Sequence, residues 1–276
     1  MSIKILGDFH IHTTYSDGLF SVEEVLAMAK NRNLSIIAIT DHDVLAGSLK
    51  AKSLESAELK AIVGIELSTE YRGESIHILG YFPDPKNLEG LEEFLNEQRE
   101  GRKKRAFLIK ELLLKHFNID LNMDFTKSMP SITRGAIAQA IINQGFPYTH
   151  DEIFTKIIGR GCPAYLPSTK LDTESGIRLL KEYGAFTVLA HPVLLKKNAP
   201  EDIVQMGVDG IEAIYPVNTN EDTEKFIHLA QKEGLFVTAG SDFHGFDDAK
   251  HGNLGEHYLE GRNLEIFLNK ITKGNK

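Results

Sequence analysis

Short apolar runs alternate with amphipathic stretches along most of the chain. Seven of these runs have the length and the Ile, Val, Leu and Ala content of buried strands. They lie at residues 3–9, 35–40, 61–66, 75–81, 185–190, 209–214 and 235–239. Helical patterns lie between several of them, at 46–56, 173–183 and 220–232, and Ser21 with Glu24 forms a capping-box signature for a further helix. Strand and helix therefore alternate around what we expect to be one core.

The alternation breaks at Pro83-Asp84-Pro85. The elements predicted after this break are helical, at 88–117, 132–143 and 150–158. We interpret residues 98–166 as a helical insertion that caps the substrate site. Residues 1–97 and 167–276 are then the two parts of one barrel domain.

Strand–helix alternation predicts an α/β fold, with the strands closing into a parallel barrel. Because the chain has about seven such strands rather than eight, we expect a distorted (β/α) barrel. An open doubly wound sheet is the alternative. The 276 residues are enough for one large domain with an insertion.

Composition narrows the classes of partner and compartment. The net charge of -8 argues against duplex DNA and an anionic membrane as partners, and no run is long enough to span a membrane. Cys162 is the single cysteine, so no intrachain disulfide can form. Residues 1–9 read as a strand and not as a signal peptide. We therefore expect a cytoplasmic protein.

The first strand ends in His10-Ile11-His12, followed by Ser16-Asp17-Gly18. Alternate residues of a strand project to the same face, so His10 and His12 lie side by side. Two neighbouring imidazoles form half of a metal site, and Asp17 brings a carboxylate near them. Two buried, hydrogen-bonded histidines are the simpler interpretation, and the acidic and histidine residues at later strand ends argue against it.

Those later residues mostly follow the carboxyl ends of the predicted strands. They are His42, Glu66, His77, His191, Asp242 and His244. In a barrel these ends converge on one face, where active sites lie. His77 is the exception, because it lies inside the run 75–81, which would have to be shorter than drawn or kinked near Gly80.

The donors are imidazoles and carboxylates without a thiolate, which suits Mn²⁺, Fe²⁺ or Zn²⁺. They are too many for one ion, so two or three divalent ions that share a carboxylate fit better. Such ions activate water and stabilise the charge of a phosphoryl transfer.

Several segments resemble those of the PHP (polymerase and histidinol phosphatase) phosphoesterases: His10-x-His12 with Ser16-Asp17-Gly18, Thr40-Asp41-His42-Asp43, Glu66, His77, His191-Pro192 and Ser241-Asp242-Phe243-His244-Gly245. Length and arrangement are most similar to the TrpH/YciV-like subgroup. The resemblance implies a distorted seven-stranded barrel with a trinuclear site, often loaded with manganese. It also implies hydrolysis of the 3′-phosphate of 3′,5′-bisphosphonucleotides, and in some members degradation of short RNA from the 5′ end.

The same resemblance implies which residues hold the ions and carry catalysis. The first ion would be bound by His10, His12, Glu66 and Asp242, the second by Asp17, His42 and His244, and the third by Glu66, His77 and His191. Glu66 would therefore bridge two ions. Asp8 and Asp41 are better candidates for partners that orient imidazoles.

Arg134 is the candidate substrate-binding residue. Ser131-Ile132-Thr133-Arg134 opens a predicted helix, helix starts favour anions, and arginine can bind phosphate through two parallel hydrogen bonds. The subgroup often has a histidine two residues after this arginine, whereas Ala136 stands here. An ordinary surface arginine is the alternative.

Other functions remain open at this level. Histidinol phosphate phosphatase and 5′-3′ exoribonuclease share the metals and the fold. A metal-binding PHP module without catalysis is disfavoured, because no polymerase segment is present and the ligand set looks complete. An amidohydrolase also begins with His-x-His, but Glu66 fills the place where that family usually has a lysine.

Several polar residues are set aside as structural. The run 102–105 reads as a solvated helix face rather than an RNA-binding surface. Glu212 and Tyr215 either line the pocket or form a strand-end pair that satisfies local backbone groups. His251 lies past the last motif; we favour a place outside the site, with an approach to it in a mobile loop as the alternative. His116, His150 and His228 are placed on helix surfaces.

Overall fold

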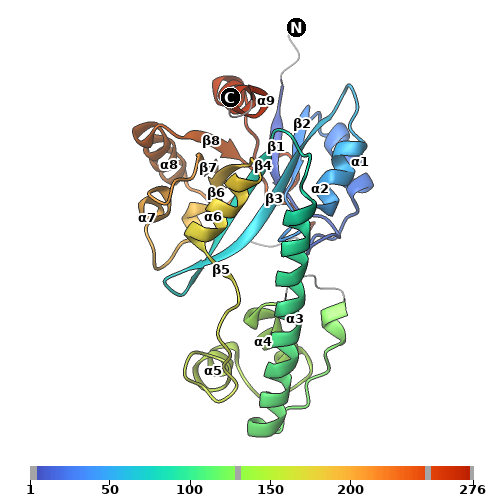
Figure 1. Ribbon diagram of the computed structural model, residues 1–276, viewed down its shortest axis with the longest axis vertical. Helices are drawn as coiled ribbons and strands as arrows, with labels where there is room; N and C mark the ends of the chain where they lie inside the picture. The colour runs from blue at the N-terminus through green and yellow to red at the C-terminus, as the bar shows by residue number, and fades with distance from the viewer. Residues whose placement is uncertain (1–4, 128–131, 246–249, 274–276) are drawn as a thin grey trace. The chain divides into compact units, whose positions relative to one another are not determined.

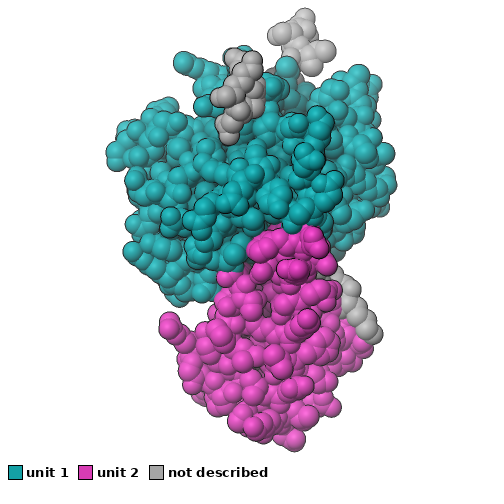
Figure 2. Space-filling model, viewed as in Figure 1, with its two compact units in different colours: residues 1–92, 171–276 teal, residues 93–170 magenta. Residues whose placement is uncertain are grey.

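The computed structural model describes residues 5–127, 132–245 and 250–273. The start of the expected run 3–9 and Ser131 lie outside these residues. The chain forms two compact units, one of residues 1–92 and 171–276 and one of residues 93–170 (Figure 2). The expected insertion 98–166 falls within the second unit, and its role as a substrate cap stays a prediction.

The first unit contains an almost continuous alternation of strands and helices (Figure 1). Its elements before the second unit are β1 (Gly7–Ile11), α1 (Val22–Asn31), β2 (Ile36–Ile39), α2 (Ala46–Ser53), β3 (Lys60–Tyr71) and β4 (Glu74–Phe82). Those after it are β5 (Leu171–Asp172), α6 (Thr173–Glu182), β6 (Phe186–Leu189), α7 (Pro200–Val204), β7 (Gly210–Ile214), α8 (Asn220–Glu233), β8 (Phe236–Ala239) and α9 (Gly261–Lys273).

The strands form one sheet in the order β1-β2-β3-β4-β6-β7-β8, with the short β5 paired to β3. The two edge strands of this sheet, β1 and β8, approach each other. Just beyond their carboxyl ends, the backbone N–H of His12 donates to the carbonyl of Phe243 at 2.9 Å. The sheet is thus a nearly closed barrel of seven strands. This confirms the expected distorted α/β barrel and rules out the open sheet.

One strand runs against the others, and here the expected all-parallel barrel is wrong. β4 is antiparallel to both β3 and β6, whereas the pairs β1–β2, β2–β3, β6–β7 and β7–β8 are parallel. β3 and β4 are joined by a tight hairpin turn in which Arg72 and Gly73 both have positive φ, 47° and 77°. Because β4 is reversed, its amino-terminal half lies at the end of the barrel where the parallel strands finish.

Helices cover the outside of the barrel and apolar side chains close one end. Residues of α1 and α2 pack with β1 and β2 in one core cluster, which includes Val25, Ile37 and Ala51. At the amino-terminal end of the parallel strands, the Phe267 ring of α9 lies 4.6 Å from that of Phe9 and 5.2 Å from that of Tyr81. The opposite end is left to polar side chains.

Local signals account for most element boundaries. The predicted capping box is confirmed at α1, where Ser21 accepts from the backbone of Glu24 and the Glu24 carboxylate accepts from Ser21. The elements β5, α7 and α9 were not predicted. β5 and α7 are too short to show a period, and α9 lies beyond the last motif. No helix among the described residues has the length and apolar character needed to cross a membrane.

The second unit is helical. α3 (Glu89–Phe117) leads into it, and α4 (Arg134–Asn143) and α5 (His150–Glu152), which continues as a π-helix, pack with it around a core that includes Ile109, Leu113 and Ile137. The interpretation of 102–105 as a solvated face is wrong for its arginines. Arg102 is only 5% exposed and Arg105 donates to the carbonyl of Leu166 at 2.9 Å.

Candidate metal centre

The barrel end opposite the aromatic closure gathers every histidine and carboxylate proposed from the sequence as a metal ligand. Glu66 lies at the middle of the group, on β3, and is 1% exposed. Its Oε2 atom is 3.3 Å from Nε2 of His10, 3.2 Å from Nε2 of His12 and 3.0 Å from Nδ1 of His42. All three of these contacts involve Oε2, so the other carboxylate oxygen, Oε1, can contact different side chains.

Glu66 Oε1 faces a second pair of imidazoles. It lies 2.8 Å from Nδ1 of His77 and 3.0 Å from Nε2 of His191. The reversed strand explains the position of His77, which pairs in register with Ser68 and so projects on the same side as Glu66. No kink at Gly80 is needed. The two oxygens of one carboxylate thus face two different sets of imidazoles.

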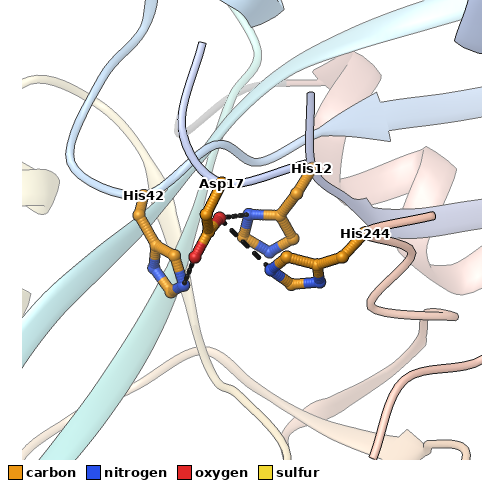
Figure 3. Close-up of side chains that lie close together, drawn as sticks. All are labelled: His12, Asp17, His42 and His244. Carbon is orange, nitrogen blue, oxygen red and sulfur yellow. Dashed lines mark ion pairs between the residues drawn. The ribbon is translucent and has the colours of Figure 1, made fainter. Parts of the chain in front are cut away.

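Asp17 is the centre of another group (Figure 3). Its Oδ1 lies 3.2 Å from Nε2 of His244 and 3.5 Å from Nδ1 of His12, and its Oδ2 lies 3.7 Å from Nε2 of His42. The Asp17 side chain is 49% exposed, whereas that of Glu66 is buried. Asp17 is therefore the solvent-exposed carboxylate of the site, while His12 and His244 beside it are buried.

The chemistry of the buried donor atoms fits divalent cations. Buried polar atoms in proteins normally form hydrogen bonds. Among the described residues five such atoms here form none, and they converge on one another: Nε2 of His10 and His12, Nδ1 of His42, Oε2 of Glu66 and Oδ1 of Asp242. Spacings of 3.0–3.3 Å between them match neighbouring ligands that share an ion with bonds of about 2.0–2.2 Å.

Compact groupings of candidate ligand atoms overlap the three expected ion sites. They are His10, His12, Glu66 and Asp242; His12, Asp17, His42 and His244; His42, Glu66 and His77; and Asp242, His244 and His251. The first grouping is identical to the expected first ion site, and the second is the expected second ion site with His12 added. The third contains Glu66 and His77 of the expected third ion site, with His42 where the resemblance implied His191. The metal and the number of ions remain predictions.

The imidazoles and carboxylates of the site shift one another's pKa values. Burial lowers the pKa of His12, but its contacts with Asp242 and Glu66 outweigh burial and raise that pKa to about 10. Burial raises the pKa of Asp242, whereas the imidazoles of His10 and His12 lower it well below its usual range. Burial and the neighbouring His12 lower the pKa of His244, which keeps this imidazole neutral. The buried carboxylates and imidazoles therefore shift one another's pKa values, carboxylates raising those of His10 and His12 and imidazoles lowering that of Asp242.

The backbone around two candidate ligands is unusual. His191 has φ 29° and Asp242 has φ 51°; positive φ is uncommon for residues other than glycine, although Asp and His adopt it more often than most. Such conformations cluster at functional sites because the surrounding contacts hold them in place. Here they occur where β6 and β8 end, and they turn both side chains toward Glu66 and His10.

Glu212 and Tyr215 contact candidate ligands, as the pocket-lining interpretation of these two residues expects. Glu212 Oε1 lies 2.9 Å from Nδ1 of His10, and the Tyr215 hydroxyl donates to Oδ2 of Asp242 at 2.8 Å. A lone carboxylate in the apolar strand 210–214 was the available signal. His251 also reaches the site, with its ring 4.1 Å from that of His244.

Of the two residues proposed to orient imidazoles, Asp41 is linked to a histidine ring, whereas Asp8 is hydrogen-bonded to a backbone segment that carries a candidate ligand. Asp41 accepts from the Ser16 hydroxyl at 2.6 Å, and that hydroxyl lies 3.3 Å from Nδ1 of His12, so Asp41 reaches an imidazole through one residue. Asp8 accepts from the Ser241 hydroxyl at 2.6 Å and thus braces the segment that carries Asp242. Burial raises the pKa of Asp8 to about 6, although the hydrogen bonds from Ser241 lower it.

The remaining sequence candidates lie elsewhere. Arg134 is the first residue of α4, behind the N-cap Thr133, and its guanidinium lies 5.4 Å from the Tyr165 ring centre. His116, His150 and His228 are exposed, as expected. Phosphate binding by Arg134 stays a prediction.

Comparison with known proteins identifies the family. The PHP domain model matches residues 8–159. The 5′-3′ exoribonuclease Rnm of Salmonella typhimurium is 30% identical, over 87% of this chain and 85% of the relative. The 3′,5′-nucleoside bisphosphate phosphatase of Chromobacterium violaceum is 28% identical, over 86% of each chain. The phosphoribosyl 1,2-cyclic phosphate 1,2-diphosphodiesterase of Eggerthella lenta is 27% identical, over 87% of this chain and 95% of the relative.

A solved structure agrees with these relatives. A Bifidobacterium adolescentis protein described as a metal-dependent phosphoesterase superposes with a TM-score of 0.71 and 27% identity, over 98% of this chain and 96% of that one. Fold, donor set and relatives agree on one conclusion. The chain belongs to the PHP domain family and is a metal-dependent phosphoesterase.

Proposed function

We propose that this phosphoesterase hydrolyses a phosphomonoester of a small nucleotide, the 3′-phosphate of 3′,5′-bisphosphonucleotides. The observation that carries the proposal is the set of unsatisfied buried donor atoms around Glu66, which fits a cluster of divalent ions. The relative from Chromobacterium violaceum, named for this activity, supports the choice of substrate.

The proposed ligands are the residues expected from the sequence. His10, His12, Glu66 and Asp242 hold one ion, Asp17, His42 and His244 a second, and Glu66, His77 and His191 a third. Mn²⁺ is the proposed metal, with Fe²⁺ and Zn²⁺ as alternatives that the same donors accept. When bound, such ions activate water and stabilise charge on the phosphoryl oxygens.

The protein's own groups position the reactants. Glu66 keeps two sets of imidazoles at fixed spacing through its separate oxygens. Asp41, acting through Ser16, orients the His12 ring, and Tyr215 holds the Asp242 carboxylate. Arg134 binds the substrate phosphate that is not cleaved.

A turnover panel tests the substrate. On protein reconstituted with Mn²⁺, we expect phosphate release from 3′-phosphoadenosine 5′-phosphate to exceed that from histidinol phosphate by at least about tenfold in kcat/KM. Product analysis should find the 5′-phosphate retained. A preference for histidinol phosphate would overturn the substrate assignment and leave the phosphoesterase assignment intact.

A 5′-3′ exoribonuclease is the second candidate, because three relatives at 28%, 30% and 29% identity carry that name. A short 5′-phosphorylated RNA, added to the same panel, separates the two. Stepwise release of mononucleotides from its 5′ end, faster than turnover of the bisphosphonucleotide, would favour the exoribonuclease.

Arg134→Ala is expected to raise KM by about tenfold or more while the metal content stays unchanged, because one charge-assisted phosphate contact is lost. Steady-state kinetics and elemental analysis measure the two quantities. Arg160→Ala is the matched control, since Arg160 is an exposed arginine of the same unit. An unchanged KM in Arg134→Ala would reject the phosphate contact.

A further inference from the structure

Glu212 is the carboxylate of β7 and is absent from the proposed ligand set, yet it is fully buried. A buried carboxylate is costly unless its oxygens are satisfied. One of them, Oε1, lies 2.9 Å from Nδ1 of His10. If Nδ1 of a neutral imidazole donates this hydrogen bond, Nε2 carries no proton. That Nε2 atom is the one that lies 3.3 Å from both Glu66 Oε2 and Asp242 Oδ1.

The second oxygen of Glu212 acts on a different strand. Oε2 accepts the backbone N–H of His191 at 2.8 Å. His191 is the residue with φ 29° and ψ 60°, at the point where β6 ends. This hydrogen bond holds the unusual turn that places Nε2 of His191 3.0 Å from Glu66 Oε1. One side chain therefore restrains the ring of one proposed ligand and the backbone of another.

Gly240 leaves the space through which Glu212 reaches His10. A Cβ atom at position 240 would overlap Cβ of His10 and would lie 2.7 Å from Oε1 of Glu212. Gly240 has no positive φ that would require glycine, so close packing is its reason. The end of β8 is thus shaped to fit the hydrogen bond between β7 and β1.

We propose that Glu212 is a positioning residue that aligns His10 and His191 for two different ions, and that Gly240 provides the room. The inference rests on the ligand set given under the proposed function. Partners of this kind fix the ring orientation and tautomer of metal-binding histidines, and their loss typically weakens metal affinity or activity by about 10- to 100-fold.

The test compares Glu212→Ala, Glu212→Gln and wild type as full chains, with Co²⁺ as the probe. Co²⁺ affinity is measured by competition with a chelator, ligand geometry by the visible spectrum, and kcat and KM by turnover. Glu224→Gln is the matched control, because Glu224 is an exposed glutamate of the same unit.

In Glu212→Ala we expect about 10- to 100-fold weaker Co²⁺ binding, an altered spectrum and a lower kcat with little change in KM. Glu212→Gln should lose less Co²⁺ affinity, because its amide oxygen still accepts from His10. Some loss should remain, because its NH₂ group cannot accept the backbone N–H of His191. If Glu212→Ala does not fold, Glu212→Gln alone decides through its affinity and spectrum. Wild-type affinity and spectrum in the Glu212 variants would overturn the positioning role alone, whereas wild type that binds no Co²⁺ would overturn the ligand set as well.

Discussion

Glu66→Gln is expected to lower kcat/KM for phosphoester hydrolysis by about a thousandfold, equivalent to about 4 kcal/mol of lost transition-state stabilisation. The substitution keeps the side-chain shape but removes the charge that faces His10, His12 and His42 through one oxygen, and His77 and His191 through the other. Two ion sites should weaken together. Elemental analysis should therefore find fewer bound ions than in wild type.

Glu70→Gln is the matched control for this experiment. Glu70 lies on the same strand, β3, and is only partly buried, so the variant removes the same charge away from the cluster. It should retain wild-type turnover and metal content. A Glu66→Gln protein with wild-type ion content and kcat/KM would show that Glu66 does not bridge the ions.

Chelation of the metal is expected to lower the melting temperature by roughly 5–10 °C and to abolish turnover. Ligand binding at about 100 times Kd stabilises a protein by about 2.7 kcal/mol, and one kcal/mol shifts Tm by roughly 2–4 °C in a chain of this size. Thermal unfolding before and after chelation, and after Mn²⁺ is added back, measures both effects. Equal melting temperatures in the three states would contradict a tightly bound metal centre.

The difference in melting temperature between metal-loaded and metal-free protein should increase with pH. In the metal-free protein the pKa of His12 is raised from 6.5 to about 10, so its protonation stabilises the fold fully below 6.5 and that stabilisation is lost as pH rises toward 10. Metal binding requires unprotonated imidazoles and therefore strengthens over the same range. The Tm difference between loaded and metal-free protein should be larger at about pH 8.5 than at about pH 6. A larger difference at the lower pH would contradict this linkage.

The sequence determined the features that depend on short segments. The strands of the barrel, the capping box at Ser21 and the position of His10 beside His12 follow from local apolar runs and from the alternation of side chains along a strand. The chemical type of each metal-binding side chain is also given by the sequence. Imidazoles and carboxylates at strand ends, without a thiolate, indicate hard or borderline divalent metals.

Only the tertiary structure decided the features that depend on which segments become neighbours. The pattern of 74–82 is the same for a parallel and an antiparallel strand, so only its pairing with β3 and β6 brought His77 to Glu66. The roles of Glu212 and Tyr215 were likewise left open by the sequence, since their partners His10 and Asp242 are 202 and 27 residues away in the chain. Hydrophobic periodicity records which side of an element is buried, and contacts between distant segments depend on how the whole barrel closes.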